Sequence, residues 1–174
     1  SSFVQEMEDA LYSPTGYNSL GKHYSEYIDI ESLARMYVIQ EWSENLDAGI
    51  SSFYLYKDAG SGKLYAGPVW DFDIALGNSD GRFGYDLKDP EIEWARNTRL
   101  YKNTIFGQLP VKYVPTILNA LYSHTDFVNE VNSVWDKDFK PSVDTLVASG
   151  ISSYENNVKD SAVMNAIRWN SYGT

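Results

Sequence analysis

The stretch from Asp47 to Asn78 constrains the fold of this chain more than any other part of the sequence. Residues 53–57 are aromatic and apolar enough for a buried strand, and residues 63–70 read as a second strand. Between them, residues 58–62 (Asp-Ala-Gly-Ser-Gly) consist of turn-forming types. The pattern predicts a single β-hairpin.

The predicted hairpin brings together the loops on either side of it. Strands rise about 3.3 Å per residue, so paired strands of similar length begin and end side by side. Asp47 precedes the first strand, whereas Asp71 and Asp73 follow the second. Converging carboxylates repel one another unless a cation or solvent separates them. We therefore expect a functional site here, with Asp47 and Asp71 on one rim of the hairpin.

The composition excludes several classes of site and partner. The 174 residues include no cysteine, which excludes disulfides and thiolate zinc sites. A net charge of −10 argues against nucleic acid or an anionic membrane as a partner, because both require a basic surface. No apolar run approaches the roughly 20 residues of a membrane span. His23 and His124 lie far apart without ligand spacing, and we expect His124 at the surface.

Helical periodicity dominates the rest of the chain. Apolar residues recur at helical spacing in residues 1–12, and Asp29 is a good N-cap for a helix that ends near Asn45. We expect residues 79–93 to form an irregular surface segment. Other segments expected to be helical are residues 94–106, 111–121, those after Thr125, those after Pro141, 154–158 and 162–169. The sequence therefore predicts one α+β domain over residues 1–174, mostly helical, with one hairpin.

Three segments resemble the spore-coat protein H (CotH) kinase family. They are residues 41–47 (Glu-Trp-Ser-Glu-Asn-Leu-Asp), residues 52–58 (Ser-Phe-Tyr-Leu-Tyr-Lys-Asp) and residues 67–78, which contain Gly-Pro-Val-Trp-Asp-Phe-Asp and end in Ala-Leu-Gly-Asn. The resemblance covers residues 27 to 80. It implies a helical domain like a protein-kinase C-lobe, in which the hairpin carries the Asp-Phe-Asp loop.

The resemblance also implies roles for individual residues. Asp47 matches the catalytic-loop aspartate that accepts the proton of the attacking hydroxyl. Asp71 matches the metal-binding aspartate, and Asp73 would share its cation. Ser52 stands where a typical kinase has an asparagine that holds a second magnesium ion, and a serine hydroxyl is a weaker ligand. The implied cofactors are ATP and Mg²⁺, with Ca²⁺ or Mn²⁺ as alternatives.

At the level of the whole protein, the resemblance implies phosphoryl transfer to a protein phosphoacceptor by a bacterial protein that is secreted or at the cell surface. The sequence contains neither a glycine-rich phosphate loop nor an upstream segment that could carry an ATP-pairing lysine. We therefore expect the chain to be the C-lobe portion of a longer protein, without its N-lobe, and a poor catalyst alone.

Alternative interpretations stay open. The chain could be a non-catalytic interaction or adhesion module that keeps a kinase-like fold. It could also be a carbohydrate-binding module that presents tyrosine and tryptophan faces to a polysaccharide or a cell surface. Within the candidate site, residues 70–73 could form a structural turn, or Asn78 and Asp80 could add oxygen ligands to a calcium-binding loop.

Overall fold

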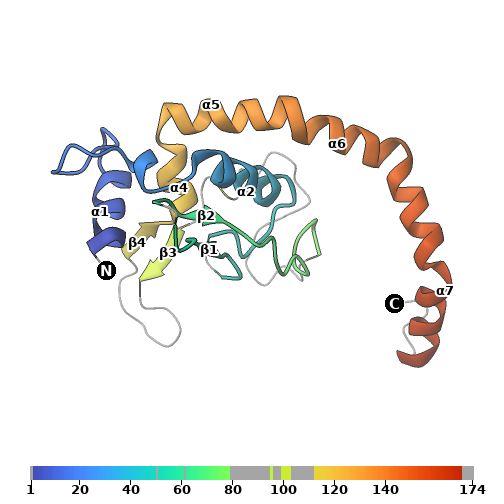
Figure 1. The fold of residues 1–174 in the computed structure, drawn as a ribbon. Coiled ribbons are helices and arrows are strands. Elements are labelled where there is room, and N and C mark those ends of the chain that lie inside the picture. The colour runs from blue at the N-terminus through green and yellow to red at the C-terminus, as the bar shows by residue number, and fades with distance from the viewer. Residues whose placement is uncertain are drawn as a thin grey trace. The chain divides into compact units, whose positions relative to one another are not determined.

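The computed structural model describes residues 2–49, 51–60, 62–78, 95, 99–102 and 112–169 (Figure 1). It divides into two compact units, Ser1–Val134 and Trp135–Thr174, which we describe one at a time. The segment 79–93, for which we predicted an irregular structure, lies outside the described residues, as does Asp80. None of the helices described has the length and apolarity needed to cross a membrane.

The first unit combines helices with two small antiparallel sheets. Its strands pair as two hairpins, β1 with β2 and β3 with β4. Helix α2 packs against α5 and against β2, and α4 packs against α5. Its elements are α1 (Ser2–Leu11), the 3-10 turn η1 (Tyr24–Glu26), α2 (Ile30–Trp42), β1 (Leu55–Tyr56), β2 (Tyr65–Ala66), β3 (Arg99–Lys102), β4 (Lys112–Pro115), α4 (Ile117–Tyr122) and α5 (Thr125–Val134).

The core of this unit lies between α2, α4 and α5. Tyr37 of α2 stacks on Tyr122 of α4, with ring centroids 5.0 Å apart. The same ring meets Phe127 of α5 edge-on at 5.9 Å. Aromatic pairs in these geometries add about 0.5–1.5 kcal/mol to the free energy gained from burial. Fully buried side chains around them include Leu33, Leu118 and Leu121.

The hairpin predicted from the Asp47–Asn78 stretch is present, although its paired strands are shorter than expected. Leu55 pairs with Ala66, and the hydrogen bond from Gly67 N–H to the Tyr54 carbonyl, at 2.9 Å, extends the pairing by one step. The hairpin is also attached to α2. Leu64 N–H donates to the Tyr27 carbonyl at 2.7 Å, just before the helix begins.

The N-terminus of α2 begins at Asp29, as the sequence predicted. The Asp29 carboxylate accepts a hydrogen bond from Ser32 N–H at 2.9 Å, which satisfies one donor of the first helical turn. Asp29 N–H donates to the Leu64 carbonyl at 2.8 Å, and the Ser32 hydroxyl accepts from Ala66 N–H at 3.1 Å. Hydrogen bonds therefore connect the first turn of α2 directly to the second strand of the hairpin.

Two helical predictions were wrong where the second hairpin forms. We expected helices over residues 94–106 and 111–121, but Arg99–Lys102 and Lys112–Pro115 are strands paired with each other. Pro115 explains the second error, because proline disfavours helix in its own position and in the residue before it. The helix begins only after Thr116, whose hydroxyl accepts from Asn119 N–H at 3.2 Å.

The two histidines have structural surroundings that the sequence did not reveal. Both rings lie against Tyr24, with the centroid of His23 at 4.3 Å and that of His124 at 4.7 Å. The prediction that His124 lies at the surface was wrong. It is buried, and its Nε2 lies 2.8 Å from the Leu11 carbonyl, so it links α5 to the end of α1.

The second unit is a continuous run of helical turns. Its elements are the π-helical turn η2 (Trp135–Phe139), α6 (Lys140–Thr145), the π-helical turn η3 (Leu146–Gly150) and α7 (Ile151–Trp169). Pro141 lies in the first turn of α6, as the sequence predicted. Residues 154–158 and 162–169, for which we expected one or two helices, belong to one helix, α7. None of the described residues in this unit is buried.

We predict that Asp29→Ala lowers the free energy of unfolding by about 1 kcal/mol, within the usual 0.5–2 kcal/mol for a lost N-cap. The substitution removes the acceptor for Ser32 N–H. Urea denaturation followed by circular dichroism measures the change. Asp58→Ala, in the exposed hairpin turn, is the matched control, and equal losses in both variants would contradict the role of the cap.

Candidate functional site

The loop that carries Asp47 follows directly after the end of α2 and is anchored on both sides of the aspartate. Leu46 and Ala48 are buried, whereas Asp47 itself is half-buried. Asp47 N–H donates to the side-chain oxygen of Asn45 at 3.2 Å, and Asn45 is fully buried. Ser51 N–H donates to the Asp47 carbonyl at 3.1 Å. These contacts fix the backbone from which the Asp47 carboxylate projects.

Gly49 permits this loop to approach α4 closely. Its φ is +70°, and a Cβ atom there would lie 3.1 Å from the Thr116 Cβ. Any other residue would therefore combine an unfavourable backbone conformation with a tight contact. Thr116 caps α4, so the Asp47 loop is held against the start of that helix.

The loop that carries Asp71 and Asp73 is tied to the C-terminal end of α2. Leu76 N–H donates to the Ser43 carbonyl at 2.6 Å, and Ala75 beside it is buried. The side-chain amide of Asn78 donates to the Asp73 carbonyl and closes the loop. Both aspartate side chains are exposed. One helix end thus supports both aspartate loops.

Ser52 joins the two loops. Its hydroxyl donates to Asp71 Oδ2 at 3.0 Å, and Ser52 lies close enough to the Asp47 carboxylate to lower the pKa of Asp47. Asp71 in turn is close enough to raise the pKa of Asp47, so the two carboxylates interact electrostatically. Their position on one rim of the hairpin stays a prediction.

The electrostatics of the site reflect this crowding. Partial burial raises the pKa of Asp47 above its ordinary value, and the nearby charges of Asp71 and then Asp73 raise it further. The Ser52 hydroxyl acts in the opposite direction and lowers the pKa of Asp47, because it stabilises the ionised form. The ionised form of Asp47 is therefore destabilised by burial and by repulsion from its neighbours, and a bound cation would reduce that repulsion.

Backbone strain is concentrated in the same place. Ser52 has a φ of 48° and Asp71 a φ of 61°, in the left-handed region that residues with a Cβ seldom occupy. Such conformations cost on the order of 1 kcal/mol each and persist where the surrounding contacts impose them. Their coincidence with the Ser52–Asp71 hydrogen bond indicates side chains aimed at each other by the fold.

Four residues that the sequence proposed for the site influence one another. A hydrogen bond links Ser52 to Asp71, and Asp71 and Asp73 are close enough to raise the pKa of Asp47. Within the described ranges, no three His, Cys, Asp or Glu side chains are grouped closely enough to hold a metal by themselves. The catalytic, cofactor and metal roles of these four residues stay predictions.

Sequence reasoning missed the residues that position the site. Asn45 orients the Asp47 backbone, and Ser43 receives the Asp71 loop. Asn45 had a readable signal, because asparagine commonly accepts a hydrogen bond from the backbone two residues later. The part played by Ser43 depends on its backbone carbonyl, so its side-chain type carries no such signal.

Comparison with known proteins identifies one relationship. No curated protein and no solved structure matched the chain at a significant level. The family model described as CotH kinase protein matches residues 1–174, which is the whole chain. This protein therefore belongs to the CotH kinase family and is a kinase-like domain.

Proposed function

We propose that the Asp47–Asp71 site performs metal- and ATP-dependent phosphoryl transfer in a secreted or cell-surface bacterial protein with a C-lobe-like fold. The observation that carries the proposal is the Ser52–Asp71 hydrogen bond next to Asp47, whose pKa is shifted by both of these residues. Phosphoryl transfer is catalysed chiefly by positioning and charge neutralisation. Two aspartates with different surroundings, one half-buried and one exposed, suit the roles of base and metal ligand.

Asp47 is the proposed base. A substrate hydroxyl would donate its hydrogen bond to the Asp47 carboxylate, which would orient the oxygen and accept its proton during transfer. The raised pKa of Asp47, caused by burial and by the neighbouring aspartates, makes it a better proton acceptor than an isolated aspartate. The anchored backbone around Asn45 limits the movement of this group.

Asp71 and Asp73 are the proposed ligands for a divalent cation, with Ser52 as a weaker oxygen donor. Mg²⁺ is commonly held by one or two carboxylates and completes its coordination with water and substrate phosphates. The residues present fit that pattern, and no third protein carboxylate is required. When bound, the ion would neutralise charge on the transferred phosphate.

A second candidate is a non-catalytic carbohydrate-binding module. It is favoured by exposed aromatic side chains on and after the hairpin, namely Tyr54, Tyr56 and Trp70, which are 48, 48 and 58% exposed. Tyr56 is stacked on Tyr65, with ring centroids 5.6 Å apart. A polysaccharide pull-down that retains the chain in the presence of a chelator would favour this candidate over phosphoryl transfer.

Thermal shift with nucleotide tests the proposed function. We expect Mg²⁺ with ATP to raise the melting temperature of the chain more than either compound alone, because the metal links the phosphates to the carboxylates. Asp71→Asn should abolish most of this increase and leave the melting temperature in metal-free buffer unchanged or slightly higher. Asp58→Asn, an exposed turn aspartate, is the control with the same change of charge.

The opposite result would identify Asp71 as a structural residue. A capping aspartate that loses its charge-assisted bond costs about 0.5–2 kcal/mol. A clear loss of stability in metal-free buffer, together with no effect of Mg²⁺ or Mn²⁺ on the parent chain, would therefore overturn the proposal.

Asp47→Asn should stabilise the protein in a pH-dependent way. Because the pKa of Asp47 is raised in the folded state, its ionised form is disfavoured by folding. This loss of folding stability is absent at pH values below the ordinary aspartate pKa of 3.8, and it is fully present at pH values above the raised pKa of Asp47. The variant should therefore melt at a higher temperature than the parent at pH 7 without metal, and at an equal temperature near pH 3. A lower melting temperature at pH 7 would show that the carboxylate is structural.

A further inference from the structure

Three tyrosines gather on one side of the hairpin that follows the Asp47 loop. Tyr56 pairs with Tyr65, and the hydrogen bond from Gly67 N–H to the Tyr54 carbonyl places Gly67 opposite Tyr54. Paired residues, and those two positions further along a strand, project from the same side of a hairpin. We refer to Tyr54, Tyr56 and Tyr65 as the aromatic face.

The aromatic face is flat and open to solvent. The rings of Tyr56 and Tyr65 stack, with centroids 5.6 Å apart and planes at 25°. Gly67 has no side chain, and a Cβ atom there would lie 3.7 Å from the Tyr56 ring, so that ring lies close to the backbone of β2. Tyr54 and Tyr56 are each 48% exposed. The face therefore presents ring surfaces that a ligand can cover.

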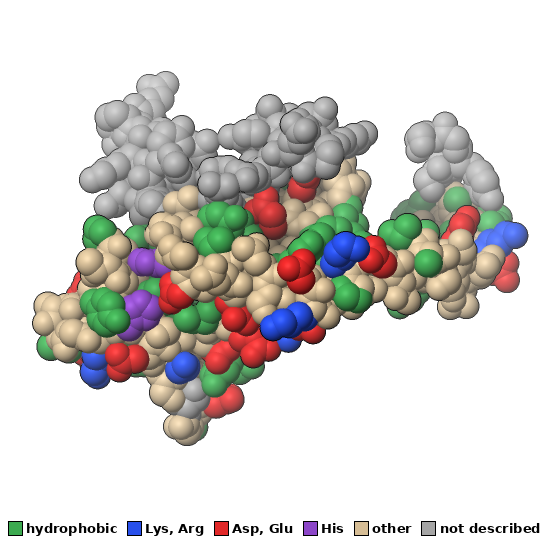
Figure 2. Space-filling view, turned by 90° about the horizontal axis from the view of Figure 1, so that it is seen from above, with side chains coloured by type: hydrophobic (Ala, Val, Ile, Leu, Met, Phe, Trp, Pro, Cys, Tyr) green, Lys and Arg blue, Asp and Glu red, His purple; other side chains and the backbone are tan. Residues whose placement is uncertain are grey.

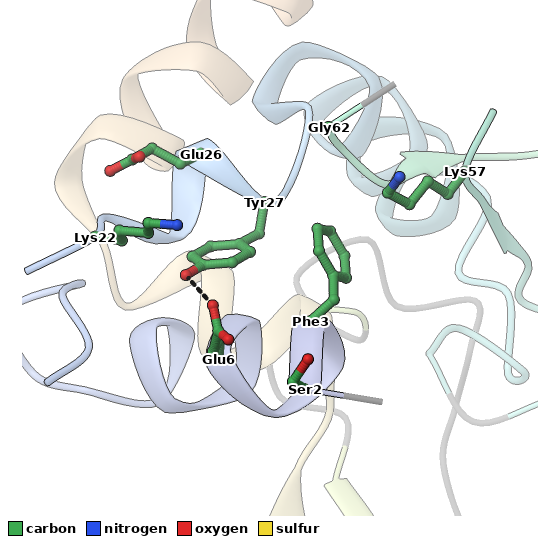
Figure 3. A pocket seen from close by; sticks show the side chains of 8 residues that line it. All are labelled: Ser2, Phe3, Glu6, Lys22, Glu26, Tyr27, Lys57 and Gly62. Atoms are coloured by element: carbon green, nitrogen blue, oxygen red, sulfur yellow. Dashed lines mark hydrogen bonds between the residues drawn. The ribbon is translucent and has the colours of Figure 1, made fainter. Parts of the chain in front are cut away.

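The opposite side of the hairpin is turned toward the rest of the first unit. Lys57 directly follows Tyr56, and its ammonium lies 5.3 Å from the centroid of the Phe3 ring in α1. Figure 3 shows Lys57 and Phe3 lining a cavity of about 390 Å³ together with residues of α1 and the η1 region. Helix α2 also packs against β2. The cavity therefore lies on the inner side, and the aromatic face is the outer side.

The aromatic face adjoins the Asp47–Asp71 site. Tyr54 follows Ser52 by two residues, so their Cα atoms lie at most about 7 Å apart. The Ser52 hydroxyl donates to Asp71 at 3.0 Å, and Ser52 also influences Asp47. Four extended residues, the separation of Tyr56 from Ser52, span about 13 Å. A ligand of that length that covers the rings therefore reaches the carboxylates of the site.

Charge restricts the ligands that suit this face. The two strand segments, residues 52–57 and 63–70, contain no acidic residue, although the chain has 24. Figure 2 shows acidic side chains more widespread than basic ones on the face that it draws. A basic peptide would find no carboxylate along the hairpin and would meet Lys57 and Lys63, whereas an acidic ligand would be repelled by the aspartates of the site. An uncharged ligand meets neither obstacle.

We propose that the aromatic face holds a neutral oligosaccharide, one hydroxyl of which is the phosphoacceptor of the Asp47–Asp71 site. A sugar ring has an apolar C–H side that stacks on a tyrosine, and its hydroxyls pair with the phenol groups. A peptide is anchored mainly by side chains that fill pockets, and the cavity beside this hairpin lies on its inner side. This inference rests on the proposed function, because it names the substrate class of the same site.

The transfer is balanced without any further reactant. The sugar hydroxyl oxygen forms a bond to the γ-phosphorus of ATP, and the bond from that phosphorus to the oxygen bridging to the β-phosphate breaks. The electron pair of the broken bond leaves with ADP. The hydroxyl proton passes to the Asp47 carboxylate and then to water. The tyrosines contribute by holding the sugar so that its hydroxyl lies beside Asp47.

Isothermal titration calorimetry with cellohexaose, an uncharged, extended and flat chain of glucose, tests the binding. We expect Tyr54→Leu and Tyr56→Leu each to weaken binding about ten-fold, because each removes one stacked ring. Leucine keeps an apolar side chain in the hairpin, and an unchanged melting temperature checks that each variant is folded. Tyr154→Leu is the matched control, since this tyrosine is 65% exposed on α7, and it should bind as the parent does.

Two further titrations test the acceptor role. Asp47→Ala should weaken the binding of cellohexaose about ten-fold and leave the shorter cellobiose unaffected, because only the longer chain covers the rings and also reaches the carboxylate. Mg²⁺ with ADP should strengthen cellohexaose binding relative to a chelator, because a cation favours ionised Asp47, which accepts a stronger hydrogen bond. Binding that neither change affects would overturn the acceptor role and favour a non-catalytic module.

The outcomes separate this inference from the proposed function. A parent chain that responds to Mg²⁺ with ATP but does not bind cellohexaose overturns this inference alone, as does equal binding by the parent and the Tyr54→Leu, Tyr56→Leu double variant. An uncharged peptide or ATP whose binding requires Tyr56, when cellohexaose does not bind, would also overturn it. Absence of any response to Mg²⁺ with ATP, together with cellohexaose binding that Asp47→Ala leaves unchanged, would overturn both.

Discussion

Two backbone hydrogen bonds at Leu64 determine where the hairpin lies relative to α2, and the candidate site depends on that placement. Leu64 N–H donates to Tyr27, and its carbonyl accepts from Asp29 N–H. The Ser32 hydroxyl adds a contact to the next part of the strand. A slip of one residue in this pairing would turn each strand side chain to the other face. The hydrogen bonds that cap α2 therefore also fix the strand that leads to Asp71.

The candidate site contains features that destabilise the folded state, and the surrounding fold compensates for them. Three aspartates near one another repel, and two left-handed backbone conformations add strain. Buried residues adjacent to the aspartates, Leu46 beside Asp47 and Ala75 four residues after Asp71, anchor the two loops. The stability gained from their burial offsets the repulsion between the carboxylates. Pre-organisation of this kind is what a cation or a transferring phosphate requires.

The sequence predicted the parts of the fold that local chemistry specifies. The Asp29 cap followed from the type of the capping residue, and the hairpin between residues 53 and 70 followed from turn residues and strand types. The second hairpin was missed because Arg99–Lys102 has no distinctive strand pattern. The burial of His124 was missed because its contact with Leu11 joins residues separated by most of the first unit.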